Sequence, residues 1–198
     1  GNFNDDSELL GVAKRVLAAR SQAVPAGVAF AGRADDAMFA TLAWLVAHED
    51  LRMLSVWSPT FALQQLESLS QWAEELAQVL SRGSWGIRAG SLSRVPAPYR
   101  PDRAKRLLTL KGLSAPEMAQ RLWPQMALVS AWDTADAAPW AAQLRLALPQ
   151  AAFEGKGLWA TEGVVTIPYE GRYPLAYQSH VYEFERLSDG VVLAPWEV

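Results

Sequence analysis

The sequence predicts a layered α/β fold in which helices flank a mainly parallel sheet, and three observations predict it. Helical periodicity dominates residues 1–124, interrupted by one short apolar run at 53–57. A second apolar run, at 126–132, precedes another helical pattern, and such alternation of strand and helix is typical of parallel sheets. Short strand patterns follow up to residue 193. We therefore expect a single unit over 1–198, mainly helical over 1–124 and rich in strands over 125–198.

The helical part begins with two patterns of apolar residues. They recur at helical spacing from Ser7 to Arg20 and again from about Ala34 to His48, with a break at Pro25 and Gly27 between them. We expect one helix in each stretch.

The run Met53–Trp57 predicts a short buried strand that leads directly into a long helix. Ser58 is a candidate N-cap and Pro59 suits the first turn. The helical pattern continues to Leu80, and an Arg-Gly pair at 82–83 is typical of a helix end.

The strand-rich part begins at Met126–Trp132, a continuous apolar run typical of a strand covered on both faces. A helix is predicted over Ala137–Leu148, with Asp133 and Asp136 as candidate caps. A glycine-bounded strand follows over Gly155–Gly163. Further strands are predicted at 164–167, 175–177, 181–186 and 191–193.

Composition excludes several classes of protein. A chain with 51% hydrophobic residues is not disordered, and zero cysteines exclude disulfide scaffolds, Cys-ligated zinc and thiol catalysis. No run is long and apolar enough to predict a membrane helix, and the polar N-terminus does not resemble a signal peptide. We therefore expect a cytoplasmic protein without a membrane partner. Gly1 in place of an initiator Met is compatible with a piece of a longer protein.

Residues 82–121 carry nine cations against two anions, although the whole chain has a net charge of −3. Two interpretations stay open: a solvated helical face around 102–110, or a basic wall beside an anionic ligand. No nucleic-acid partner is predicted, because no nucleic-acid-binding motif accompanies the cations. His48 and His180 are the only histidines, with no third ligand pattern, so no histidine metal site is predicted.

The run Gly155–Gly163 offers three features that a nucleotide site needs. Its glycines let backbone approach a ligand, Thr161 supplies a hydroxyl, and Glu162 supplies a carboxylate that can hold Mg²⁺. It is not a Walker loop, and an ordinary strand pair is the alternative reading of Thr161 and Glu162.

Gly157-Leu158-Trp159-Ala160-Thr161-Glu162-Gly163 resembles the Gly-Tyr-Gly-x-Thr-Glu nucleotide motif of adenylate-forming enzymes, in the variant found in the GH3 family of acyl acid amido synthetases, bacterial members especially. Other blocks resemble segments that flank this motif in the family: Ser55–Phe61, Leu122–Pro124, Ser130–Trp132 and Ser179–Phe184. The likeness spans about residues 40–190. It implies part of the large domain of an adenylate-forming enzyme.

The resemblance also implies a two-step reaction. A small-molecule carboxylic acid reacts with ATP to give an acyl-adenylate, and an amine or amino acid then takes the acyl group. Thr161 would bond the AMP phosphate and Glu162 would hold Mg²⁺, which makes these two the implied catalytic residues. Gly157, Leu158, Trp159 and Ala160, with Thr161, would bind ATP or AMP. Leu158 replaces the usual tyrosine, so apolar contact or Trp159 must replace its stacking on adenine.

Two features of the family have no counterpart. Nothing in 1–54 resembles its Ser/Thr/Gly-rich phosphate loop, and its later aspartate and lysine would lie beyond Val198. The resemblance therefore implies a central fragment that is inactive in isolation. The alternative is a non-catalytic α/β binding or interaction module derived from the family. No oligomeric state is predicted.

Overall fold

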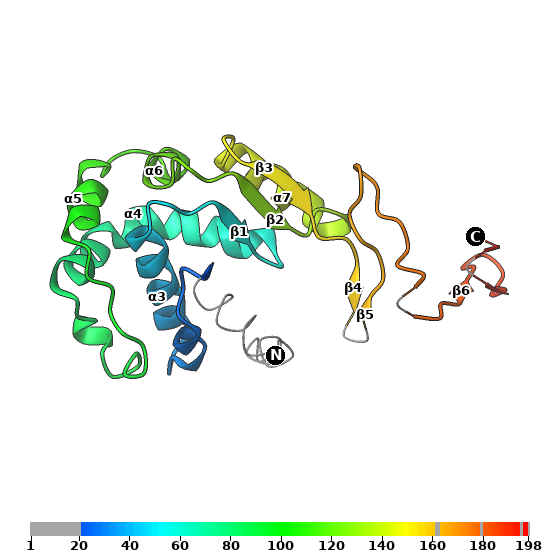
Figure 1. Cartoon of the computed structure of the whole chain (residues 1–198), viewed down its shortest axis with the longest axis horizontal. Helices are drawn as coiled ribbons and strands as arrows, with labels where there is room; N and C mark the ends of the chain where they lie inside the picture. Colours follow the sequence, from blue (N-terminus) through cyan, green and yellow to red (C-terminus); the bar gives the residue numbers. More distant parts are fainter. Residues whose placement is uncertain (1–20, 161–162, 179, 195, 198) are drawn as a thin grey trace.

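The computed structural model describes residues 21–160, 163–178, 180–194 and 196–197. Figure 1 shows helices α3 to α6 gathered at one end, the strands β1 to β3 with α7 in the middle, and the chain from β4 onward running out to the other end. The helix predicted at 7–20 lies outside the described residues.

The helical body surrounds one long central helix. α4 (Pro59–Arg82) packs against α3 (Ala34–Ala47), α5 (Pro101–Thr109), α6 (Ala115–Leu122) and α7 (Ala138–Ala147). Short 3-10 turns lie at Ala26–Phe30 (η1), Gly86–Arg88 (η2) and Ala135–Ala137 (η3). The helices predicted from Ala34 and after Ser58 are thus confirmed.

The ends of α4 follow the sequence in part. Gly83 adopts a left-handed φ of 64° and its N–H donates to Val79, which is the helix end predicted from the Arg-Gly pair. Ser58 occupies the N-cap position, but its hydroxyl lies 2.6 Å from the Thr60 hydroxyl and makes no capping bond. The predicted side-chain cap is wrong, because a neighbouring hydroxyl competes with the backbone for Ser58.

Two cations of the 82–121 segment are part of the interior. Arg103 is buried, and its guanidinium donates to the carbonyls of Val46 at 2.9 Å and Leu122 at 2.7 Å, close to the ends of α3 and α6. Burial lowers its pKa. Arg88 lies over the Phe39 ring at 4.2 Å. The interpretation of 102–110 as a solvated helical face is therefore wrong for Arg103.

The central sheet is parallel, in the order β1-β2-β3: β1 (Met53–Ser55), β2 (Leu128–Ala131) and β3 (Ala152–Gly155). Ser55, Ser130 and Glu154 lie side by side in its register. The predicted mainly parallel sheet flanked by helices is confirmed.

Only one face of this sheet is covered in the described part of the chain. Along β2, Val129 and Ala131 are buried in the core, whereas Leu128 and Ser130 are half-exposed. Met53 of the edge strand β1 is 53% exposed. Burial on both faces of β2 and burial of β1 were thus wrong predictions: hydrophobic content does not reveal which elements cover a strand. We call the side carrying Met53, Ser55, Leu128, Ser130, Ala152 and Glu154 the open face.

Beyond β3 the strands are short and antiparallel. β4 (Trp159–Ala160) pairs with β5 (Gly163–Val164), and β6 (Phe184–Glu185) with β7 (Val192–Leu193). The strand predicted at 175–177 is a single bridge between Thr166 and Leu175.

Candidate functional site

The carboxyl edge of the parallel sheet gathers polar and aromatic side chains from all three strands. The pairing continues past each strand end, since the Trp132 N–H donates to the Trp57 carbonyl at 2.9 Å and the Lys156 N–H to the Ala131 carbonyl at 3.1 Å. Ligands of open α/β sheets bind at this edge. The sequence thus places Trp57, Trp132 and Lys156 where a ligand can reach them.

Lys156 reaches across the end of β2 toward β1. Its ammonium donates to the Ser55 hydroxyl at 2.8 Å and lies 5.2 Å from the centre of the Trp57 ring, within cation–π range. Burial lowers the pKa of Lys156. Among the described residues no carboxylate lies within ion-pair distance of this ammonium, although Glu154 is on the same face.

Trp57 joins the sheet edge to the segment that resembles a nucleotide motif. Its ring centre lies 5.4 Å from that of Trp132 and 5.0 Å from that of Trp159. Trp159 is the first residue of β4, so the aromatic contact holds this hairpin against the ends of β1 and β2.

The predicted site residues have different outcomes. Gly157 has a φ of 72°, and a Cβ there would come within 2.6 Å of the Thr166 carbonyl oxygen, so only glycine fits. The Leu158 N–H donates to the Thr166 hydroxyl at 2.8 Å, while the Leu158 side chain is 60% exposed. Trp159 is 44% exposed.

Three other predicted positions are described partly or not at all. Ala160 pairs with Gly163 through its backbone. Thr161 and Glu162 lie outside the described residues, and their predicted roles stay predictions.

Asp133 fastens the following loop to the sheet and is not a helix cap as predicted. Its carboxylate accepts hydrogen bonds from Tyr173 at 2.7 Å and Arg145 at 2.8 Å, and α7 begins after Ala137 without a side-chain cap. Burial, together with the bond to Asp133, raises the pKa of Tyr173 to about 12. The Tyr173 hydroxyl and the Asp133 carboxylate both lie where a Gly155 Cβ would be, so a side chain at 155 would displace them.

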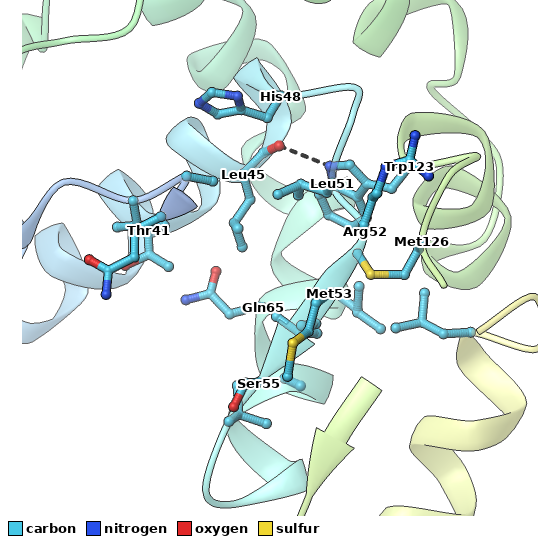
Figure 2. Close-up of a pocket in the computed structure, with 18 of the residues that line it drawn as sticks. Thr41, Leu45, His48, Leu51, Arg52, Met53, Ser55, Gln65, Trp123 and Met126 are labelled. Atoms are coloured by element: carbon cyan, nitrogen blue, oxygen red, sulfur yellow. Dashed lines mark hydrogen bonds between the residues drawn. The ribbon is translucent and has the colours of Figure 1, made fainter. Parts of the chain in front are cut away.

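A hollow of about 810 Å³ opens between α3, α4 and β1 (Figure 2). Most of its lining is apolar, including Leu45, Met53 and Met126, and Ser55 belongs to it as well. Gln65 is 4% exposed; its amide nitrogen donates to the Met38 carbonyl, and its oxygen has no hydrogen-bond partner among the described residues. The hollow therefore combines an apolar wall with one unsatisfied acceptor.

The described residues contain no cluster of three His, Cys, Asp or Glu that could hold a metal ion. In the same part of the chain, no helix is long and apolar enough to cross a membrane.

Sequence reasoning assigned no role to Lys156 or Tyr173. A signal for Lys156 was present only in part: it lies in the glycine-bounded run, but the pattern predicted a strand over 155–163, whereas β3 ends at Gly155 and leaves Lys156 at the strand end. Tyr173 had no such signal, since its partner Asp133 is 40 positions away.

A family model and solved structures both match this chain. The model of the GH3 family N-terminal domain matches residues 7–153. No curated protein sequence matches the chain. The solved structure of GH3.15 acyl acid amido synthetase superposes with a TM-score of 0.71 at 15% identity, covering 87% of this chain and 33% of that one. AtGH3.15 acyl acid amido synthetase in complex with 2,4-DB gives 0.63 at 16% identity, covering 80% and 30%. The chain thus spans about a third of the length of these synthetases, whose fold it shares over that part.

Proposed function

The chain belongs to the GH3 family, and from this premise we propose that it is the central part of an ATP-dependent acyl acid amido synthetase. In this reaction the carboxylate of a small-molecule acid attacks the α-phosphate of ATP, giving an acyl-adenylate and pyrophosphate. An amine or amino acid then displaces AMP and forms the amide. The complex of one relative with 2,4-DB supports a small-molecule acid as the substrate class.

One observation carries the proposal: the segment that resembles the nucleotide motif leaves the carboxyl edge of the sheet directly after β3. Trp159 of that segment packs on Trp57 at the end of β1. Nucleotides and similar ligands bind at this edge of parallel sheets.

The residues of the segment fit a nucleotide by their chemistry. Leu158 and Trp159 offer exposed apolar surface to a base, in place of the family's tyrosine. Thr161 would donate a hydrogen bond to the phosphate, and Glu162 is a carboxylate of the kind that Mg²⁺ prefers. Bound Mg²⁺ would offset the negative charge that the phosphates carry.

The proposal has three further parts. The isolated 198-residue chain does not adenylate its acid, which is supported by its spanning about a third of the solved synthetases. The parent protein is of the bacterial type. It is cytoplasmic, in keeping with a chain that has no cysteine.

Thermal unfolding of the chain with AMP and Mg²⁺ tests the site. Binding to the folded state raises the melting temperature of the wild type. Glu162→Ala should lose the part of this melting-temperature shift that depends on Mg²⁺. Thr161→Ala should reduce the shift that AMP causes when Mg²⁺ is absent.

Glu67→Ala is the matched control, because it removes an exposed carboxylate on α4. An equal Mg²⁺-dependent shift in wild type and Glu162→Ala would remove Glu162 as the metal ligand. A wild type that shows no shift would favour the non-catalytic binding module instead.

A further inference from the structure

We propose that Lys156 and Ser55 anchor the carboxylate of the acyl acid, at a position outside the nucleotide-motif residues that the family resemblance assigns. The inference rests on the proposed function, since it names the group that binds the acid in the same enzyme. It is carried by the geometry of the carboxyl edge of the sheet.

Lys156 is held in place and still has donors to offer. An ammonium group has three hydrogens, and one of them goes to the Ser55 hydroxyl at 2.8 Å. The Trp57 ring lies 5.2 Å from the same nitrogen, which limits the directions in which the side chain can move. Ser55, by accepting this bond, keeps its own hydrogen for a second acceptor.

The electrostatics favour an anionic ligand. Lys156 is half-buried, and burial lowers its pKa, which means that the protein disfavours its charge there. In the described part of the chain no carboxylate pairs with it, unlike Lys111, which pairs with Glu74. A bound anion would supply the missing partner and stabilise the ammonium.

The surroundings favour a monoanionic carboxylate over a phosphate group. One ammonium and one hydroxyl match the two oxygens of a carboxylate, whereas phosphate groups of nucleotides carry more charge and draw on more donors. Ser55 also lines the hollow of about 810 Å³, whose wall is mostly apolar. An acid whose carboxylate meets Lys156 can therefore place its apolar body against Trp57 or in this hollow.

Direct binding of 4-phenylbutanoate to the 198-residue chain tests the assignment, with the neutral 4-phenylbutanamide as a matched ligand and no nucleotide present. Isothermal titration should show that the wild type prefers the acid. Lys156→Met should weaken acid binding about tenfold or more, the range for hydrogen bonds to charged groups, and leave amide binding unchanged. Ser55→Ala should weaken acid binding less, and Lys156→Arg should restore part of the loss.

Lys105→Met controls for the change in net charge, because Lys105 is an exposed cation on α5. Circular dichroism of each variant separates misfolding from lost binding, and Lys156→Arg keeps the test valid if Lys156→Met misfolds. Equal acid affinity in wild type and Lys156→Met would overturn the inference, as would a wild type that binds acid and amide alike or binds neither. A Lys156→Met variant that loses AMP binding but keeps the acid would also overturn it, in favour of a phosphate contact.

The two experiments distinguish a failure of the carboxylate anchor from a failure of the proposed function. Acid binding that depends on Lys156, with no response to AMP and Mg²⁺ through Glu162, would leave the carboxylate anchor standing and contradict the adenylating site. A Glu162-dependent nucleotide response with acid binding independent of Lys156 would do the reverse.

Discussion

The helical body and the segment after β3 differ in how much side chain they bury. In the described part of the chain, every fully buried large side chain lies between Phe39 and Leu148, and no residue after Leu148 contributes a buried apolar side chain. Exposed large apolar residues are frequent in the segment from 158 to 196. The body is thus stabilised by its own core, whereas the segment is held by individual contacts.

Several of those contacts can be named. Tyr173 donates to Asp133 at the sheet edge, Trp159 packs on Trp57, and Lys156 donates to Ser55 at 2.8 Å. The candidate site thus lies at the border of a well-packed body and a weakly buried segment. Such borders combine fixed side chains with backbone that can adjust to a ligand.

The largest effect should come from Arg88 in the body. Its guanidinium binds Asp36 at 2.6 Å and Glu75 at 2.7 Å, so Arg88→Met leaves a buried carboxylate without its main partner. We expect a loss of about 3–5 kcal/mol in the free energy of unfolding, measured with urea. Arg82→Met, an exposed cation at the end of α4, should change it little. Similar losses in both variants would contradict a buried ion-pair network.

Truncating one leucine in each region compares the two directly. Leu76→Ala removes a fully buried side chain of α4 and should cost about 2–5 kcal/mol of unfolding free energy. Leu187→Ala removes a side chain that is 97% exposed and should change stability by less than about 0.5 kcal/mol. Comparable losses would mean that the segment has a core of its own.

Acid should weaken the body through Asp36. Burial alone would raise its pKa, but the hydrogen bond from Arg88 and the charges of Arg88 and Arg33 outweigh it and lower the pKa. The stabilisation is therefore complete above the ordinary aspartate pKa and is lost as the pH falls through the lowered value. In Asp36→Asn this part of the acid dependence should disappear, with a smaller effect than Leu76→Ala. An unchanged pH profile of unfolding would exclude Asp36 as its source.

The smallest effect should appear at the attachment of the segment. Tyr173→Phe removes the hydrogen bond to Asp133, and a single hydrogen bond contributes about 1 kcal/mol to the free energy of the structure it holds. Amide hydrogen exchange over 163–176 should accelerate while the melting temperature of the body stays the same. Tyr169→Phe, at an exposed tyrosine nearby, is the control. If neither variant changes exchange, the Tyr173 bond does not hold the loop.

Sequence periodicity predicted the helices and strands better than it predicted which elements pack against them. α3, α4 and the parallel strands β1 and β2 followed from the sequence pattern, because periodicity and apolar runs report which residues of one element are apolar. β3 did not, since the strand predicted over 155–163 begins where β3 (Ala152–Gly155) ends. The half-covered sheet did not, since the apolar run at 126–132 looks the same whether helices pack on one face or two.

The candidate site shows the same limit. The glycine-bounded run was visible in the sequence, whereas the Lys156 and Ser55 contact joins residues 101 positions apart. Ser58 and Asp133 are residue types that commonly cap helices. However, the Ser58 side chain binds Thr60, and the Asp133 side chain binds Tyr173 and Arg145. A hydroxyl two residues away competes for Ser58, whereas partners far along the chain decide the role of Asp133, which local pattern does not encode.

The parallel sheet also fixes an order of assembly during synthesis. β1 must wait for β2, because Met53 pairs with Leu128, and Ser55 waits longer still for Lys156. α3, α4 and α5 are close along the chain and can pack while the ribosome is still translating the second half. The carboxyl edge, with the proposed anchor, is therefore among the last parts of the fold to form, and β1 remains an unpaired strand until β2 arrives.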